Sequence, residues 1–133
     1  MIEYTVKVYD NGTRSWWLNG QLHRECGLPA MEFANGSKRW FLNGKLHRKD
    51  GLPAVKCANG DKFWYLNGEL HREDGPAIEY ADGGKYWYLN GHELTEEEFF
   101  DRTPKPKNSK LVKFLKELLA CLDDPEIRKG SIN

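Results

Sequence analysis

The chain has 133 residues, enough for one modest domain, and its 20 basic and 20 acidic residues cancel in formal charge. This balance excludes a strong long-range attraction of the whole molecule to nucleic acid or to an anionic membrane. It hides an asymmetry, since residues 1–100 carry 12 Lys/Arg against 15 Asp/Glu, a net of −3, and residues 101–133 carry 8 against 5, a net of +3. Opposite charges are compatible with the C-terminal segment docking on the rest of the chain, or with a separate basic contact surface.

The cysteines indicate the compartment. Cys26, Cys57 and Cys121 are odd in number and have no paired spacing, which argues against a disulfide framework and indicates a reducing setting. The first residues alternate polar and apolar, without the apolar core of a secretion signal. No run approaches the roughly 18–20 apolar residues that a transmembrane helix needs. We therefore expect a cytoplasmic protein.

From residue 11 the chain repeats itself four times, with a period of 24 residues that shortens to 23 before the last copy. We call the copies repeat 1 (residues 11–34), repeat 2 (35–58), repeat 3 (59–81) and repeat 4 (82–94). Each holds an Asn-Gly or Asp-Gly pair and a Trp-aromatic-Leu-Asn-Gly segment. The first three also hold Leu-His-Arg and a Gly-Pro-Ala step, with Leu between Gly and Pro in repeats 1 and 2. Such self-similarity predicts units that contact mainly their neighbours.

The turn residues predict the fold class. Asn-Gly and Asp-Gly favour type I′ hairpins, because only residues that tolerate positive φ fit both central positions. Two such pairs per repeat, with aromatic and β-branched residues between them, predict about eight short strands. Each Pro marks a break, since it cannot donate a ladder hydrogen bond. We expect a mainly β chain whose residues 1–94 form a single antiparallel β-meander of tandem hairpins, roughly 35–40 Å long.

Residues 9–94 resemble the variant MORN repeats of bacterial and phage proteins, through the period and the Trp-x-Leu-Asn-Gly-x-Leu-His-Arg-x-Asp-Gly-x-Pro-Ala wording. Some of those proteins are labelled antitoxin components. The chain departs from the pattern at Cys26, where the next two repeats have Asp50 and Asp74, and at Cys57, where the neighbours have Phe33 and Tyr80. The resemblance implies a β-meander and a binding role, and it implies no substrate.

The histidines and the turn residues predict no metal site, cofactor site or catalytic centre. His23, His47 and His71 are two strands apart, about 9–10 Å, too far to share a zinc ion that holds its ligands at about 2.0–2.3 Å. Each is expected across from the Trp of its own repeat, as an aromatic cross-strand contact. No Ser-His-Asp pattern in a nucleophile-elbow context and no phosphate-cradling loop occurs. We expect no enzyme activity.

The arginines of the Leu-His-Arg segments precede turns. Arg48 and Asp50 flank one turn, and Arg72 and Asp74 flank another, so we expect a local ion pair or a side-chain-to-backbone bond that shapes each turn. Because Cys26 replaces the acid in repeat 1, we expect Arg24 to be the arginine most available to an outside ligand.

Both faces of the Trp-containing strands are apolar. One face carries Trp16, Trp40, Trp64 and Trp87 with the following Leu residues, and we expect it to be core. The other carries Trp17, Phe41, Tyr65 and Tyr88, joined by Leu22, Leu46 and Leu70 if the turns are tight. A half-solvated sheet alternates apolar with polar residues, so this second face is either another packing layer or a partner surface, and we expect Glu32, Lys56 and Glu79 at its rim. The predicted partner-binding residues are Trp17, Phe41, Tyr65, Tyr88, Arg24 and Arg39.

After Leu94 the pattern changes from strand to helix. Thr95 and Glu98 form a capping box, so residues 95–108 are expected to hold a short helix and a linker with two prolines. Ser109 starts a predicted amphipathic helix in the C-terminal segment, residues 109–133. At 1.5 Å per residue this helix is about 21 Å long, shorter than the sheet, so it leaves part of an aromatic face bare. A second copy of the chain or a foreign partner would cover that part.

A basic run without any acid extends from Arg102 to Lys116. The predicted basic contact residues in it are Lys105, Lys107, Lys110 and Lys113. This run is either a solvated surface or a contact for an acidic protein, nucleic acid phosphates or an anionic membrane. Aromatic residues are not interleaved with the lysines, which disfavours nucleic acid without excluding it.

These features together predict a non-enzymatic protein-binding repeat protein. By resemblance it is phage- or prophage-associated and neutralises a toxin or a host protein, as an antitoxin or an anti-defence, anti-CRISPR-type inhibitor does. The alternatives are a MORN-type scaffold at membranes or lipid headgroups, and a structural homo-oligomeric subunit, such as a homodimer.

Overall fold

The computed structural model describes residues 2–103, 115 and 117–120. The chain forms two compact parts, Met1–Thr103 and Pro104–Asn133, and each is described by itself. The boundary between them falls inside the segment that the sequence predicts to hold a short helix and a linker. All four repeats and the helix after them therefore belong to the first part.

Fourteen strands and one bounded helix make up the first part. They are β1 Thr5–Val8, β2 Arg14–Leu18, β3 Gln21–Leu22, β4 Met31–Glu32, β5 Lys38–Arg39, β6 Phe41–Leu42, β7 Lys45–Leu46, β8 Val55–Lys56, β9 Lys62–Phe63, β10 Tyr65–Leu66, β11 Glu69–Leu70, β12 Ile78–Glu79, β13 Lys85–Leu89, β14 His92–Leu94 and α1 Glu96–Arg102.

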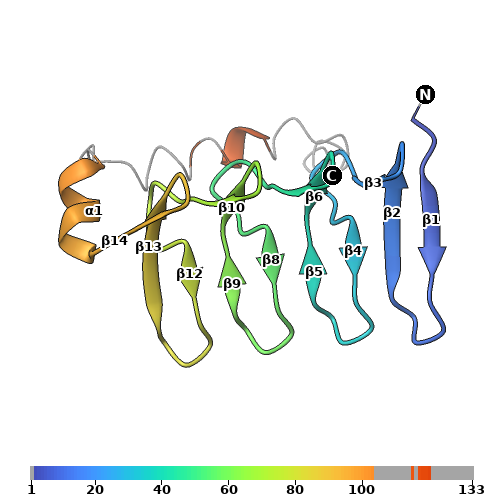
Figure 1. Cartoon of the computed structure of the whole chain (residues 1–133), viewed down its shortest axis with the longest axis horizontal. Coiled ribbons are helices and arrows are strands. Elements are labelled where there is room, and N and C mark those ends of the chain that lie inside the picture. The colour runs from blue at the N-terminus through green and yellow to red at the C-terminus, as the bar shows by residue number, and fades with distance from the viewer. Residues whose placement is uncertain (1, 104–114, 116, 121–133) are drawn as a thin grey trace, which may run out of the picture. The chain divides into compact units, whose positions relative to one another are not determined.

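The strands form an antiparallel meander, which confirms the predicted fold class (Figure 1). The main sheet runs in chain order as β1-β2-β4-β5-β8-β9-β12-β13-β14, with β3 paired to β2. Two small hairpins, β6–β7 and β10–β11, form separate ladders. Each repeat thus contributes one hairpin of the main sheet and one small hairpin.

The two Asn-Gly pairs of a repeat form different turns. Asn19 and Gly20 both have positive φ, 51° and 76°, as the predicted type I′ turn requires. At Asn11-Gly12 only the glycine has positive φ, 93°, so the prediction of a type I′ turn is wrong there. The side-chain Oδ1 of Asn11 accepts a 2.9 Å hydrogen bond from the Thr13 N–H, and this local bond keeps Asn11 in an ordinary backbone conformation while glycine takes the left-handed position.

The predicted eight strands are divided into shorter pieces because the chain leaves the main sheet at the Trp of the middle repeats. The Trp40 N–H donates to the Ala54 carbonyl at 2.8 Å, and this bond continues the hydrogen bonding of the main sheet. The Trp40 carbonyl accepts from the His47 N–H at 3.0 Å, and this bond belongs to the small hairpin. β2 and β13, in the first and last repeats, run through their Trp residues without a break.

The small hairpins are joined along the row by backbone hydrogen bonds. The Gly44 N–H donates to the Leu22 carbonyl at 2.9 Å, and the Arg24 N–H donates to the Phe41 carbonyl at 3.2 Å. The same two bonds recur one repeat further on at each step. The backbone of each repeat is therefore bonded to the next in two places, in the main sheet and in the small hairpins.

The core lies on the face that the Trp residues share, as predicted. Trp40 and Trp64 are each 6% exposed, and the alanines opposite them, Ala54 and Ala77, are fully buried. The indole N–H of Trp40 donates to the Gly27 carbonyl at 2.9 Å, so the loop of the preceding repeat covers the ring. Trp64 makes the equivalent bond to Gly51. These loops close the core over Trp40 and Trp64.

Trp87 departs from this pattern because repeat 3 lacks the Leu between Gly75 and Pro76. Gly75 does not have the positive φ of Gly27 and Gly51. The buried indole N–H of Trp87 has no hydrogen-bond partner among the described residues. One deleted loop residue thus removes the contact that covers the previous two Trp rings.

The histidines link each repeat to the next. The Asn43 N–H donates to Nδ1 of His23 at 2.8 Å, and the Asn90 N–H donates to Nδ1 of His71 at 2.8 Å. His47 makes the same contact with Asn67. Because Nδ1 accepts, the proton of each neutral ring is on Nε2, which in His23 faces a Glu25 carboxylate oxygen at 3.0 Å. The histidines do lie across from the Trp residues, but their rings accept hydrogen bonds from the neighbouring repeat.

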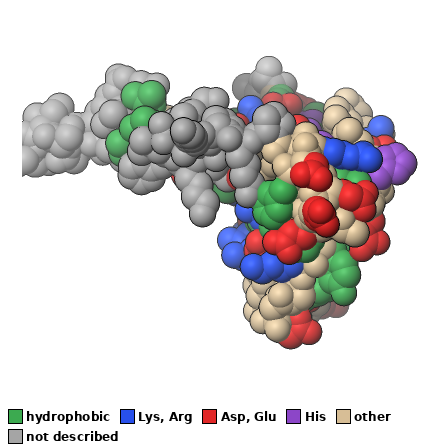
Figure 2. Space-filling view, turned by 90° about the vertical axis from the view of Figure 1, so that its left-hand side faces the viewer, with side chains coloured by type: hydrophobic (Ala, Val, Ile, Leu, Met, Phe, Trp, Pro, Cys, Tyr) green, Lys and Arg blue, Asp and Glu red, His purple; other side chains and the backbone are tan. Residues whose placement is uncertain are grey.

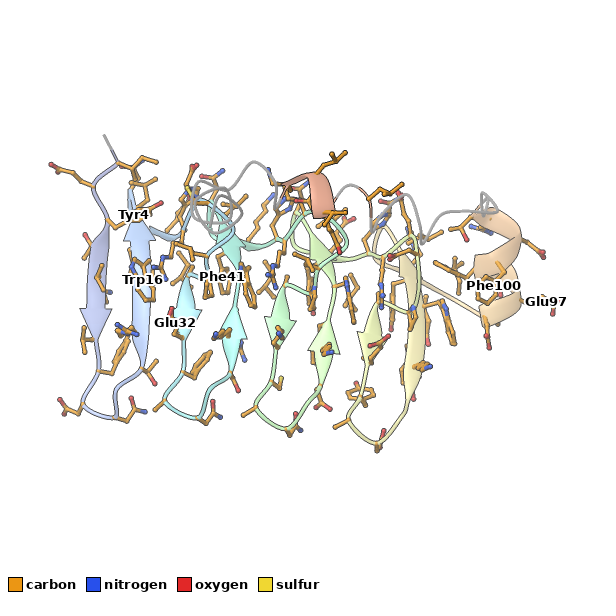
Figure 3. All side chains as sticks on the ribbon, turned by 180° about the vertical axis from the view of Figure 1, so that it is seen from behind. Tyr4, Trp16, Glu32, Phe41, Glu97 and Phe100 are labelled. Carbon is orange, nitrogen blue, oxygen red and sulfur yellow. The ribbon has the colours of Figure 1, made fainter. Side chains whose placement is uncertain are left out.

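Helix α1 covers the far end of the sheet, where it packs against β13 and β14. The predicted capping box is confirmed, since Thr95 accepts from the Glu98 N–H and the Glu98 carboxylate accepts from Thr95. Phe99 is fully buried under this helix. Acidic side chains gather at this end (Figure 2), and Glu97 projects away from the sheet (Figure 3).

In the second part, the described residues 115 and 117–120 are helical, and Leu115, Leu118 and Leu119 are exposed. The linker prolines, Cys121, the ends of the predicted helix and the predicted contact residues Lys105, Lys107, Lys110 and Lys113 lie outside the described residues. No helix among the residues that are described is long and apolar enough to cross a membrane.

Replacing His71 with Phe keeps a ring of similar size and removes the acceptor of the part-buried hydrogen bond from the Asn90 N–H. We expect the free energy of unfolding to fall by about 1 kcal/mol, measured by urea denaturation. His92→Phe, the same change at an exposed position, should shift it by less than about 0.5 kcal/mol. Equal effects of the two substitutions would show that the histidine bond does not hold neighbouring repeats together.

Candidate functional site

The predicted second face of the Trp-containing strands exists. Trp17 lies opposite Leu22, Phe41 opposite Leu46 and Tyr65 opposite Leu70, and side chains directly opposite each other share a face of a ladder. This confirms the pairing that tight turns predict. In repeat 4 the place of the Leu is taken by Glu93, opposite Tyr88.

The same face continues on the main sheet. The indole N–H of Trp17 donates to the Ser15 hydroxyl at 2.8 Å, and the Lys7 ammonium lies 4.3 Å from the centre of the ring. From Ser15 the strand register places a row of opposed residues on this face. The row is Ser15, Met31, Arg39, Val55, Phe63, Ile78 and Tyr86. We define the aromatic face as Trp17, Phe33, Phe41, Phe63, Tyr65, Tyr80, Tyr86 and Tyr88, with Arg39.

The prediction that Glu32, Lys56 and Glu79 form the rim of this face is wrong. Glu32, Lys56 and Glu79 alternate with residues of the row just described, so they project from the opposite side of the sheet, where the Trp core lies. There Arg24 donates to a Glu32 carboxylate oxygen at 3.2 Å. The aromatic face is therefore more apolar than the sequence suggests, because its strands alternate with their charged residues turned to the other side.

Tyrosines form a connected cluster at one end of the aromatic face. The rings of Phe63 and Tyr80 meet edge to face with centroids 5.9 Å apart, and those of Tyr80 and Tyr86 with centroids 5.8 Å apart. Such edge-on pairs are favourable for aromatic rings. Tyr80 and Tyr86 are still 38% and 44% exposed, so the cluster presents both ring surface and hydroxyl groups to a partner.

Two other tyrosines of the aromatic face, Tyr65 and Tyr88, have a raised pKa. Burial raises the pKa of Tyr65, and Tyr80 adds to the rise, while the Arg39 guanidinium opposes it. Burial also raises the pKa of Tyr88, with further contributions from the Glu93 carboxylate and neighbouring tyrosines. At neutral pH these phenols are uncharged groups that can donate hydrogen bonds.

Arg39 lies within the aromatic face as its exposed cation. Its guanidinium lies 5.1 Å from the centre of the Phe33 ring, and it is near enough to Tyr65 to affect that side chain's pKa. Within the described part of the chain, no carboxylate lies at ion-pair distance from Arg39. The structure thus places Arg39 among the predicted aromatic residues, where its charge is open to solvent.

Arg24 is less available to an outside ligand than the sequence suggests. Its guanidinium lies 3.7 Å from the centre of the Trp16 ring and donates to the Pro29 carbonyl at 3.1 Å and to Glu32. Trp16 and Glu32 lie on the neighbouring strands β2 and β4 (Figure 3). The expectation that Arg24 is the arginine most available to an outside ligand is therefore wrong, because Trp16, Glu32 and the Pro29 carbonyl already hold its guanidinium.

The other two arginines share this arrangement with one difference. Arg72 pairs with Asp74 at 2.9 Å, as predicted, and also with Glu79 at 3.1 Å. Arg48 stacks on Trp40 at 3.8 Å and, of the two predicted local contacts, makes the side-chain-to-backbone bond, to the Pro53 carbonyl, and not the ion pair with Asp50. Among the described residues Arg48 has no carboxylate partner, and burial lowers its pKa from the ordinary value.

The described residues hold no group of three or more His, Cys, Asp or Glu side chains that could bind a metal ion. A hollow of about 390 Å³ lies where β13 and β14 meet α1, lined by residues that include Tyr86, Trp87, Leu94 and Glu98. Its edge shares Tyr86 with the aromatic face. Sequence reasoning missed Phe63, Tyr80 and Tyr86 as site residues, although the two-residue alternation from Tyr88 back to Tyr86 places both on one face.

No protein-family model, curated protein or solved structure compared with the chain matches it. The resemblance to variant MORN repeats therefore stays a prediction, and the fold rests on the structure itself.

The two arginines of the predicted partner-binding set should behave differently when replaced. Arg24→Gln removes the stack on Trp16 and leaves the Pro29 carbonyl and Glu32 without their donor, so we expect a loss of about 1–3 kcal/mol in unfolding free energy. Arg39→Gln should cost less than about 1 kcal/mol, because its only stack is at an exposed site. Urea denaturation of both variants checks this, and a larger loss for Arg39→Gln would reverse the two assignments.

Proposed function

We propose that the chain is a non-enzymatic module that binds another protein through the aromatic face. The observation that carries this proposal is the exposed pair of Tyr80 and Tyr86, on the same side of the sheet as the exposed Arg39 and facing away from the Trp core. Tyr, Trp and Arg are the residues that most often dominate binding energy in protein interfaces. Tyrosine also contributes a large contact area with few rotatable bonds.

The exposed members of the aromatic face, Tyr80, Tyr86 and Arg39, are available for binding because their side chains lie outside the buried core, to which the same side of the sheet contributes Val55 and Ile78. The rings of Trp16, Trp40 and Trp64 are each covered by the arginine of their own repeat, and Trp40 and Trp64 also by the loop of the repeat before. Stacked repeats also present an extended surface, on which several residues of the same kind face a partner together. An apolar surface that is exposed and contiguous favours an interaction site over a solvated surface.

The resemblance to variant MORN-repeat proteins supports a specific kind of partner. We propose that the chain neutralises a toxin or a host defence protein, as a phage- or prophage-associated antitoxin or inhibitor does in the cytoplasm. Such a role needs affinity and stoichiometric binding rather than chemistry, and it is compatible with a site built from aromatic rings and exposed cations.

Tyr86→Ala should abolish capture of the partner in a pull-down from lysate of the source cells, quantified by mass spectrometry. A central aromatic contact is typically worth about 2 kcal/mol or more, so affinity for the captured protein should fall by at least roughly tenfold. Leu28→Ala is the control, since Leu28 is equally exposed, 45% against 44%, and belongs to the loop on the Trp side of the sheet, whose Gly27 carbonyl accepts from Trp40. Binding that survives Tyr86→Ala and Arg39→Ala together, with a native circular dichroism spectrum, would exclude the aromatic face as the interface.

Titration distinguishes neutralisation by binding from inactivation by catalysis. Increasing amounts of the chain, added to a fixed amount of the captured protein, should reduce that protein's activity linearly to an end point at a fixed molar ratio. An enzyme would inactivate an excess of its target over time at a small molar ratio. Complete inactivation at a tenth of the equivalent amount would contradict a binding mechanism.

A further inference from the structure

Repeat 2 reverses the charge of two positions that are acidic in the repeats on either side. The positions are Glu25, Lys49 and Glu73 for the first, and Glu32, Lys56 and Glu79 for the second. In repeats 1 and 3 these acids have defined roles, since the first faces a histidine ring and the second pairs with the arginine stacked on Trp. Repeat 2 keeps the histidine and the arginine but gives each a lysine in place of its acid.

The strand register gathers further lysines around Lys56. Lys38 lies directly opposite it on β5, and Lys62 directly opposite it on β9. All three side chains are exposed. Like charges directly opposite each other destabilise a sheet, so this arrangement weakens the fold instead of supporting it. A ligand that neutralises the lysines would remove that cost.

Arg48 completes the group. Because Arg24 and Arg72 reach the acids at the positions equivalent to Lys56, and Arg48 makes the same stack and the same proline carbonyl bond, its guanidinium lies beside Lys56. Its orientation is fixed by Trp40, so it is a pre-organised donor to a carboxylate. We define the basic patch as Lys38, Arg48, Lys56 and Lys62.

The basic patch is limited in extent and lies opposite the aromatic face. In the same row Glu32 flanks Lys38, and Glu79 flanks Lys62. The lysines therefore cover three neighbouring strands, about 10 Å at roughly 4.8 Å per strand, with negative charge on both sides. A duplex with one charge per about 1.7 Å of axis would meet these acids as well, so the boundaries favour a short anionic segment over nucleic acid.

We propose that the basic patch binds a short acidic segment of a partner protein, through Asp or Glu carboxylates held by Arg48 and the three lysines. This goes beyond the binding proposed for the aromatic face, because the two surfaces lie on opposite sides of the sheet. Either can fail its test without affecting the other.

A fluorescent ten-residue peptide of alternating Asp and Glu, measured by fluorescence anisotropy with the full chain at low salt, tests the basic patch. Lys56→Glu should lower the affinity at least tenfold. Lys85→Glu makes the same charge change in the same row, next to Glu79, and should lower it less than twofold. Equal losses in the two variants, or no binding of the peptide to the unaltered chain, would overturn the proposal. Tighter binding of a single- or double-stranded DNA ten-mer than of the peptide would overturn it in favour of nucleic acid.

The same variant separates binding from folding. Lys56→Glu gives Arg48 the carboxylate partner that Arg24 and Arg72 have, and it removes two like-charge contacts. Its urea unfolding midpoint should therefore be higher than that of the unaltered chain while peptide binding is lost. A lower midpoint would show that the lysines serve the fold, and would contradict the assignment of the basic patch as a binding surface.

Discussion

The stacking of an arginine on the tryptophan of the same repeat is the contact on which the rest of the structure depends. A sheet of short strands has little thickness, and an exposed row of tryptophans would leave it without a core. The arginine covers one ring face and at the same time holds a proline carbonyl, which draws the following loop against the sheet. That loop then provides the carbonyl that accepts the indole N–H of the next tryptophan. The same set of contacts therefore buries the tryptophan ring and attaches the next repeat.

This arrangement explains how the sheet can leave one side open. In most single-layer sheets the apolar face must be covered by a helix or a second sheet. Here loops and arginines cover the tryptophan side, and histidine rings fasten successive small hairpins by accepting backbone N–H groups. The aromatic face is then free for a partner, with Arg39 and the exposed tyrosines as its most specific features. Binding there need not compete with folding.

Differences between otherwise equal repeats are informative because the repeats provide their own comparison. Trp87 shows what a missing loop residue does, since its indole N–H is left without the carbonyl that Trp40 and Trp64 have. Arg48 shows what a change of charge does, since lysine stands where its neighbours find a glutamate. The change at Trp87 lies at the end of the row of repeats, where α1 packs on the sheet in place of a loop. The change beside Arg48 lies in the middle of the row, where the end of the sheet cannot explain it, and for this reason we interpret it as functional.

The sequence alone determined the period, the antiparallel meander, the capping box of α1 and the partners of the aromatic residues in the small hairpins. These depend on local chemistry, namely on which residues tolerate positive φ and on the two-residue alternation of a strand. The tertiary structure decided which charged residues share a face, what covers the tryptophans and which arginine lacks an acid. Those outcomes depend on contacts between residues in different strands and repeats, such as Asn43 with His23 or Trp40 with Gly27. Along the chain Cys26 makes Arg24 look like the arginine without an acid, and only the tertiary structure shows that Arg24 meets Glu32 while Arg48 has no carboxylate partner among the described residues.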